Sequence, residues 1–241
     1  MRPETIQRLL EINRTFYSNF AEEFSQTRSE RQASVSFIIS MIPAGANVLD
    51  VGCGHGRIAL ALERARRRVT YRGVDGSRAM IAIAQASSAS FQNVRADFAV
   101  ADLANSAWAR AFADVKFDVV LALAVLHHLP SFQLRARVLA DLARLCRGGG
   151  VIVLTSWQFL ENERMRKKIV AWSAAPVDAD DVEEGDTLLS WKRGGVGYRY
   201  CHQITIDEIT KIAESCGLRV ERQFCADDGL NLYSILTRAS G

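Results

Sequence analysis

The sequence predicts an α/β fold built on a mostly parallel sheet with helices on both of its faces. Between residues 47 and 155, short apolar runs alternate with segments of helical spacing, which is typical of strand–helix–strand units. A glycine-rich turn at residues 52–56 joins the first apolar run to the first of these helices. The last two apolar runs are separated by turn residues at 227–231, so we expect them to pair as an antiparallel hairpin.

These patterns give seven strands in all. The parallel strands are predicted at 47–51, 69–74, 94–100, 117–123 and 149–155. The helices between them are predicted at 57–67, 77–87, 105–113 and 132–145. A helix at 206–216, with Gly217 as its C-cap, precedes the hairpin strands at 218–225 and 231–237. The expected architecture is therefore a Rossmann-like, seven-stranded, mostly parallel sheet that ends in an antiparallel hairpin.

The chain is expected to form a single domain, residues 1–241, with two additions to the sheet. Residues 1–43 form a helical cap, because apolar positions recur with helical spacing over 4–24 and again over 33–42. Residues 157–204 break the alternation and are interpreted as an insert, or lid, over the ligand-binding edge of the sheet. This insert begins with a basic helical stretch at 164–168 and continues with an acidic tract at 178–186.

Composition excludes some classes of protein and leaves others open. The net charge of +3 and the isoelectric point near 8.7 are compatible with RNA binding but do not establish it. No apolar run is long enough to cross a bilayer, so no membrane segment is expected. Five cysteines, an odd number with no C-x-x-C pair, favour a reduced, cytoplasmic protein without structural zinc or disulfides.

The most informative motif is the glycine-rich turn at residues 48–56, Val-Leu-Asp-Val-Gly-Cys-Gly-His-Gly. A dinucleotide fingerprint, G-x-G-x-x-G, would need a glycine where Arg57 stands. The spacing D-x-G-x-G-x-G instead resembles that of the class I S-adenosylmethionine (SAM) methyltransferase superfamily. A glycine turn that binds no ligand is the alternative interpretation.

The resemblance implies a set of cofactor-binding residues at the carboxyl ends of the strands. In this family Asp50 and the glycine turn would lie under the methionine part of SAM. Asp75 would accept hydrogen bonds from the ribose hydroxyls, and Asp102 would accept one from the adenine amino group. Asp97 competes with Asp102 for that last role. Main-chain groups near Ala124 lie beside the methionine ammonium. The full expected set is Tyr17, Asp50, Gly52, Cys53, Gly54, Gly56, Asp75, Gly76, Met80, Asp102, Leu103 and Ala124.

Outside these common motifs, the chain resembles the tRNA methyltransferases that esterify a carboxymethyl group on the wobble uridine. The likeness rests on FS-x-TR at residues 24–28, AVLHHL at 124–129, GD at 185–186 with WK at 191–192, and RY-x-H at 199–202. Gln158, Phe159, Cys201 and Leu232 depart from the family pattern. Another carboxylate acceptor therefore stays open as an alternative.

A carboxylate acceptor needs no general base, because it is already ionised at neutral pH. Catalysis then requires a cation that holds the acceptor, and Arg28, Arg199 and His202 are the candidates. If the acceptor is a hydroxyl or an amine, His128 or the neighbouring His127 is the candidate base. The product of either reaction is S-adenosylhomocysteine (SAH).

Three functions stay open at this point. The chain acts on tRNA, acts on a small-molecule acceptor, or binds SAM as a non-catalytic partner subunit. Eukaryotic members of the resembled family work with a small zinc-containing activator, and nothing in the sequence says whether this chain needs one. The basic stretch at 164–168 contacts phosphates or forms a solvated helix face. Four aromatic residues stack on a base or fill the core: Trp157, Trp191, Tyr198 and Tyr200.

Overall fold

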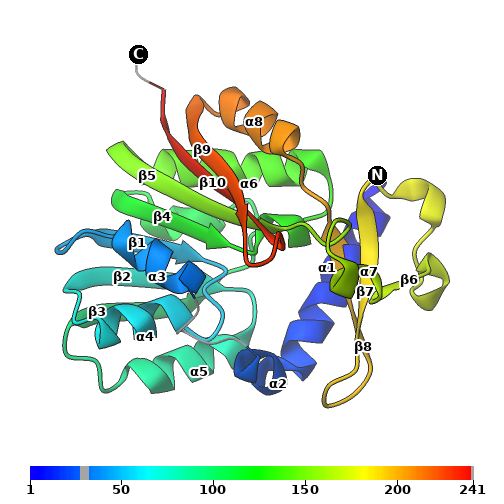
Figure 1. The fold of residues 1–241 in the computed structure, drawn as a ribbon, viewed down its shortest axis with the longest axis horizontal. Coiled ribbons are helices and arrows are strands. Elements are labelled where there is room, and N and C mark those ends of the chain that lie inside the picture. The colour runs from blue at the N-terminus through cyan, green and yellow to red at the C-terminus, as the bar shows by residue number, and fades with distance from the viewer. Residues whose placement is uncertain (28–32, 240–241) are drawn as a thin grey trace.

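The computed structural model describes residues 1–27 and 33–239. Its centre is a seven-stranded sheet with the order β3-β2-β1-β4-β5-β10-β9 (Figure 1). Strands β1 to β5 are parallel, and β10 runs antiparallel between β5 and β9. The strands are β1 Asn47–Val51, β2 Val69–Asp75, β3 Val94–Val100, β4 Phe117–Leu123, β5 Cys146–Trp157, β9 Leu218–Ala226 and β10 Asn231–Arg238. The predicted sheet and its terminal hairpin are confirmed.

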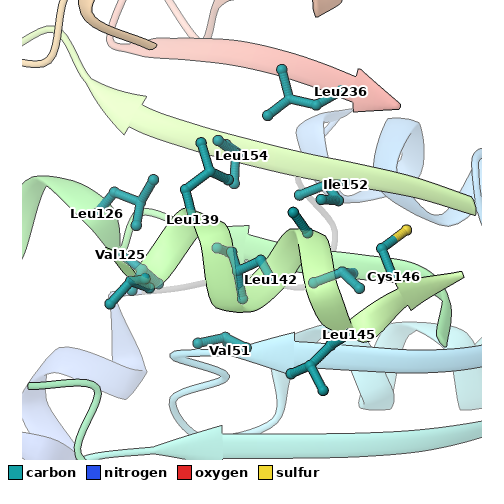
Figure 2. Close-up of a cluster of buried hydrophobic side chains, with 14 of the residues drawn as sticks. Val51, Val125, Leu126, Leu139, Leu142, Leu145, Cys146, Ile152, Leu154 and Leu236 are labelled. Carbon is teal, nitrogen blue, oxygen red and sulfur yellow. The ribbon is translucent and has the colours of Figure 1, made fainter. Parts of the chain in front are cut away.

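Helices cover both faces of this sheet (Figure 1). One face packs against α3 Ala33–Ser40, α4 Arg57–Arg64 and α5 Arg78–Ser88. The other face packs against α6 Phe132–Leu145 and α8 Ile206–Ser215 (Figure 2). Strands buried on both faces are apolar over their central length, and this explains the apolar run from Val119 to Leu123 in β4.

Side-chain caps fix where several helices begin. Ser77, Ser131 and Thr205 accept hydrogen bonds from the backbone N–H three residues later and so cap α5, α6 and α8. The helix predicted at 105–113 is wrong, because only a 3₁₀ turn, Trp108–Phe112, forms there. The Asn105 side chain accepts from the backbone N–H of Ala107, and such local bonds compete with a regular helix.

The helical segment predicted at residues 4–24 forms two helices, α1 Pro3–Asn19 and α2 Ala21–Gln26. Phe20 lies between them and caps both. No helix within residues 1–27 or 33–239 is long and apolar enough to span a membrane.

The insert forms a small antiparallel sheet of its own, with the order β6-β7-β8, beside α1 (Figure 1). Its strands are β6 Ile169–Val170, β7 Asp186–Trp191 and β8 Gly197–His202. The basic helix predicted at 164–168 is a single turn, α7 Glu163–Arg166. One of its neighbouring cations, Lys167, forms an ion pair with Glu163 at 2.7 Å.

The acidic tract holds α1 against the insert. Asp181 accepts from the backbone N–H of Arg2 at 3.1 Å, from its Nε at 2.9 Å and from Thr5 Oγ1 at 2.5 Å. Asp178 also contacts the Arg2 guanidinium, at 3.1 Å. These carboxylates neutralise the first turn of α1, so they are not a free acidic surface.

Candidate cofactor and acceptor site

A cavity of about 480 Å³ lies at the carboxyl ends of β1 to β4, under α1. Open α/β sheets bind ligands at this edge. Most of the expected residues line it: Tyr17, Gly52, Cys53, Gly54, Asp75, Gly76, Met80, Asp102, Leu103, Ala124 and His128. Four expected residues do not line it: Asp50, Gly56, Arg199 and His202. Arg28 lies outside the described residues.

The glycine turn brings backbone close to the cavity. The backbone N–H groups of Gly52 and Cys53 donate hydrogen bonds to the Val74 carbonyl oxygen, at 2.7 and 3.0 Å. Gly52 has φ +71°, and a Cβ there would lie 2.3 Å from Val125 Cγ2. The turn therefore depends on glycine at position 52 for its conformation and for its packing.

We expect Gly52→Ala to lower the free energy of unfolding clearly more than Gly54→Ala does. Both positions have positive φ, and each alanine costs about 1–2 kcal/mol for that conformation. Only the alanine at position 52 also clashes, since a Cβ at Gly54 has no neighbour within 4 Å among the described residues. Urea denaturation of the two variants measures the difference, and equal losses would contradict the clash.

Asp75 closes the glycine turn and faces the cavity. Its two carboxylate oxygens accept from the backbone N–H of Gly54 at 2.9 Å and of Ser77 at 2.8 Å. Burial raises the pKa of Asp75, and the two N–H donors partly offset this rise. The carboxylate is thus held by backbone groups at the end of β2, where a ribose is expected.

Asp102 is paired with a residue of the N-terminal helix. Its Oδ2 accepts from Arg14 Nη2 at 2.7 Å, and its Oδ1 accepts from the backbone N–H of Ala104 at 2.9 Å. Asp97, the competing acid, does not line the cavity. No sequence motif predicted a role for Arg14, because only the packing of α1 over the sheet brings this residue to Asp102.

Asp50 lies behind the glycine turn, outside the cavity lining. It is 2% exposed and accepts a short hydrogen bond from the Tyr71 hydroxyl. Burial raises the pKa of Asp50 to about 7, although Tyr71 and the charge of Arg57 act in the opposite direction. Arg57 itself lines the cavity, and it is a further cation near the methionine end that the motif did not reveal.

The far end of the cavity holds an aromatic and imidazole wall. The Tyr17 hydroxyl lies 2.9 Å from His128 Nε2, and His128 Nδ1 lies 3.0 Å from the Tyr200 carbonyl oxygen. Because a carbonyl only accepts, Nδ1 carries the proton, and in the neutral ring Nε2 accepts from Tyr17. Ala124, with φ +60°, donates its N–H to Thr155 Oγ1 at 2.9 Å beside this wall.

Arg199 lies within a group of four aromatic rings. Its Cζ is 4.8 Å from the centre of the Phe16 ring, 5.1 Å from Trp157, 5.5 Å from Trp191 and 5.7 Å from Phe24. Two of these rings, Phe24 and Trp157, also line the cavity. The residue is 2% exposed, its Nε has no hydrogen-bond partner, and no carboxylate within the described ranges pairs with it.

A guanidinium that is buried without a counter-ion is energetically unfavourable, even when aromatic faces supply cation–π contacts. Most buried charges in proteins are paired. Arg199 is therefore a buried cation for which the described residues supply no counter-ion.

His202 lies elsewhere, at the buried carboxyl end of β8. Its two ring nitrogens contact Asp186 Oδ1 at 2.7 Å and Glu208 Oε2 at 2.9 Å. Since both nitrogens already have partners and His202 does not line the cavity, the structure does not bring it together with the other expected acceptor residues. Of the aromatic candidates, only Trp157 reaches the cavity, whereas Trp191 and Tyr200 are buried in the packing of α1 on the insert.

Comparisons with known proteins agree with this geometry. Residues 48–150 match a family model described as "Methyltransferase domain". These residues include the glycine turn, Asp75, Asp102 and His128, which meet at the cavity. Residues 48–150 form a methyltransferase domain.

The methyltransferase domain has curated and structural relatives. A "tRNA (carboxymethyluridine(34)-5-O)-methyltransferase" from Arabidopsis thaliana is 28% identical over 70% of this chain, which spans 37% of that relative. The magnesium protoporphyrin IX methyltransferase of Synechocystis, solved with bound SAH, has a TM-score of 0.64 and 20% identity, with 95% and 99% of the two chains covered.

A third relative was solved as a complex. It is a putative methyltransferase bound to the Haloferax volcanii Trm112 methyltransferase activator, and its TM-score is 0.66 at 15% identity over 95% and 98% of the two chains. At these identities the two solved structures establish the fold that the chains share.

The Synechocystis relative holds SAH, which is SAM without the transferred methyl group. The residues around the cavity fit SAM, because Gly52 and Gly54 line it with backbone alone and Asp75 presents a carboxylate to the same cavity.

Proposed function

We propose that this chain methylates a carboxylate, and that the acceptor is a carboxymethyl group on the wobble uridine of tRNA. The observation that carries the first part is Arg199, a buried guanidinium without a counter-ion behind two rings of the cavity wall. Arginine recognises a carboxylate with two parallel hydrogen bonds, so an anionic acceptor supplies the partner that this cation lacks.

In this proposal the glycine turn and Asp75 hold the methionine and ribose parts of the cofactor, and Asp102 with Leu103 holds the adenine. When bound, SAM would supply a sulfonium methyl group: a carboxylate oxygen would attack the methyl carbon, the carbon–sulfur bond would break, and SAH would be the leaving group. No proton moves, so the chain needs to align the acceptor and exclude water. Tyr17, His128 and Trp157 form the wall that does so.

The choice of tRNA is supported by the activity for which the Arabidopsis relative is named, and by the RY-x-H and GD…WK motifs. A small carboxylate-bearing metabolite is the alternative acceptor. A small activator subunit is also part of the proposal, supported by the Haloferax complex of a similar fold. We further propose a cytoplasmic location, on the cysteine pattern alone.

The chemical stability of the methylated product tests this function, because a methyl ester is cleaved by mild alkali. Mild alkali converts methyl esters on bulk tRNA to free carboxylates, which gives an acceptor pool; untreated tRNA is the matched control. We expect transfer of labelled methyl from SAM to the treated pool, and release of the label as methanol by a second alkali treatment. The assay is run with and without a Trm112-type activator. Absence of label in every arm would contradict the tRNA proposal.

A hydroxyl acceptor is a second candidate because of the contacts of His128. Its ring is oriented by the Tyr200 carbonyl, and its Nε2 meets Tyr17 at the cavity, an arrangement suited to a general base. Methylation of a hydroxyl would give an alkali-stable label and a rate that falls steeply in His128→Asn. An ester product with a nearly unchanged rate in that variant excludes this role.

A further inference from the structure

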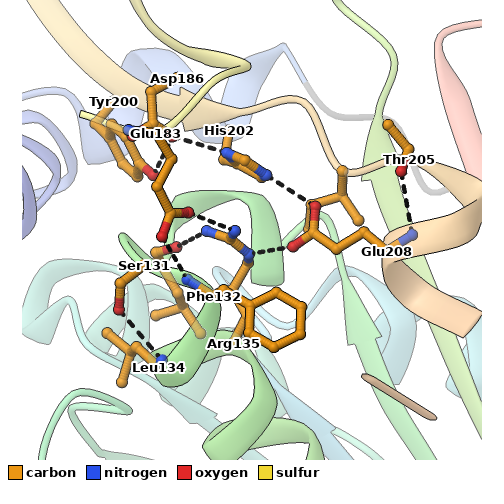
Figure 3. Close-up of polar contacts among 12 residues, drawn as sticks. Ser131, Phe132, Leu134, Arg135, Glu183, Asp186, Tyr200, His202, Thr205 and Glu208 are labelled. Atoms are coloured by element: carbon orange, nitrogen blue, oxygen red, sulfur yellow. Dashed lines mark hydrogen bonds and ion pairs between the residues drawn. The ribbon is translucent and has the colours of Figure 1, made fainter. Parts of the chain in front are cut away.

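Six polar side chains fasten the insert to the rest of the molecule, away from the cavity (Figure 3). They come from α6, from the beginning of β7 and the turn before it, from β8 and from α8. We call this group the clasp: Arg135, Glu183, Asp186, Tyr200, His202 and Glu208.

Arg135 of α6 is the fixed cation of the clasp. It is 1% exposed, and its guanidinium donates to Glu183 Oε2 at 2.8 Å and to Glu208 Oε1 at 2.7 Å. Its Nη1 donates to the Leu129 carbonyl at 3.0 Å. Arg135 therefore links the core helix to one carboxylate of the insert and to one of α8.

His202 of β8 forms the second bridge. Nδ1 contacts Asp186 Oδ1 at 2.7 Å and Nε2 contacts Glu208 Oε2 at 2.9 Å. Ionised carboxylates only accept, so both contacts are hydrogen bonds only when both ring nitrogens carry a proton. The clasp then contains three carboxylates and two cations, and a neutral His202 loses one of its two bonds.

The clasp reaches the cavity through Tyr200. The Tyr200 hydroxyl donates to Asp186 Oδ1 at 2.7 Å, the oxygen that also contacts His202. The main chain of Tyr200 is bonded on both sides: its N–H donates to Asn13 Oδ1 at 2.9 Å, and its carbonyl accepts from His128 Nδ1 at 3.0 Å. Displacement of β8 therefore displaces the carbonyl that orients the His128 ring.

We propose that His202 is a pH-dependent positioning residue, whose doubly protonated ring holds the insert sheet against α8 and thereby fixes His128 at the acceptor end of the cavity. His202 touches neither cofactor nor acceptor in this role. It acts through Asp186 and Tyr200.

The expected direction with pH follows from the groups that face His202. Burial alone lowers the pKa of His202, but the hydrogen bonds to Asp186 and Glu208 outweigh burial and the charge of Arg135, so its pKa is raised above 6.5. Burial raises the pKa of Glu208, but His202 and Arg135 outweigh it, so its pKa is lowered below 4.5.

A raised histidine pKa stabilises the folded clasp fully below pH 6.5, and this contribution is lost as the pH rises through the folded-state pKa. The contribution of Glu208 is complete above pH 4.5 and is lost as the pH falls through its lowered pKa. The clasp is therefore strongest between these two values and opens on the alkaline side.

Hydrogen exchange in the ligand-free protein tests the clasp. Amide exchange of residues 186–202 is measured at about pH 6 and about pH 9 and divided by the intrinsic rate at each pH. We expect at least about a threefold rise in the wild type and no rise in His202→Gln, whose rates equal the wild-type value at the higher pH. No rise in the wild type, or a rise that survives in His202→Gln, would overturn the proposal.

Glu208→Gln is the second variant, because it keeps an acceptor for Arg135 and removes one carboxylate from His202. We expect the rise in exchange to begin at lower pH in this variant. Glu214→Gln, an exposed change on the same helix, is the matched control and should keep the wild-type profile. An unshifted profile in Glu208→Gln contradicts the role of that carboxylate.

The His128 ring gives a readout that general destabilisation does not produce. Its Nδ1–H, donated to the Tyr200 carbonyl, should give a protected proton resonance at the lower pH that disappears at the higher pH while the protein stays folded. With four histidines in the chain, assignment by substitution is direct. None of these measurements uses methyl transfer, so their failure and failure of the proposed reaction are separate outcomes.

Discussion

Replacement of Arg199 by methionine is expected to lower kcat/KM for a carboxylate acceptor by at least about 100-fold while leaving SAH binding unchanged. Two charge-assisted hydrogen bonds to the acceptor are lost, and about 3 kcal/mol of transition-state stabilisation corresponds to such a factor. Arg199 does not line the cofactor cavity, so the affinity for SAH has no reason to change.

The stability of Arg199→Met distinguishes a binding role from a structural one. A buried cation without a counter-ion can be replaced by an apolar side chain of similar volume at little cost, so we expect the free energy of unfolding to change by less than about 1 kcal/mol. Arg199→Lys keeps the charge but loses the planar fork, and an intermediate rate is expected.

Arg222→Met is the matched control, because Arg222 also lies over an aromatic ring, Phe224, at 4.5 Å but far from the cavity lining. It should leave kcat/KM unchanged. Full activity in Arg199→Met, or unfolding of that variant, would show that the guanidinium serves packing alone.

Asp75→Ala is expected to raise the Kd for SAH by at least tenfold, which corresponds to about 1.4 kcal/mol. Two effects add in this variant. The ribose hydroxyls lose their acceptor, and the N–H groups of Gly54 and Ser77 lose the carboxylate that holds the turn. Calorimetric titration of both proteins with SAH measures the change.

Asp97→Ala is the control for charge, since Asp97 is exposed on the neighbouring strand and does not line the cavity. Its Kd for SAH should equal that of the wild type. Equal affinity of Asp75→Ala and the wild type would mean that the end of β2 does not contribute to the cofactor site.

Local patterns were sufficient to predict the sheet and the cofactor end of the site. Short runs rich in apolar residues located β1, β3 and β4 with their observed bounds. The glycine turn and Asp75 are close in sequence to the strands that position them. The helix predicted at 105–113 was wrong because the Asn105 side chain accepts a hydrogen bond from the Ala107 backbone N–H, and periodicity does not reveal such a competing bond.

The acceptor end could not be predicted in the same way. Arg199 and His202 stand three residues apart on one strand, and both were expected to hold the acceptor. In the structure Arg199 lies among rings from α1, α2, β5 and β7, whereas His202 lies between carboxylates of β7 and α8. The sequence likewise did not show what the acidic tract contacts. In the structure Asp181 accepts a hydrogen bond from Arg2, which is 179 positions away in the chain.

The sequence by itself determined the α/β sheet, its terminal hairpin and the glycine turn at the carboxyl end of β1. Each of these depends on residue spacing within one strand–turn–helix unit. Only the tertiary structure decided which arginine is left without a counter-ion, which histidine faces the cavity and which carboxylates are neutralised internally. The physical reason is that charge compensation and burial are set by side chains brought together from distant parts of the chain, and no local pattern encodes those partners.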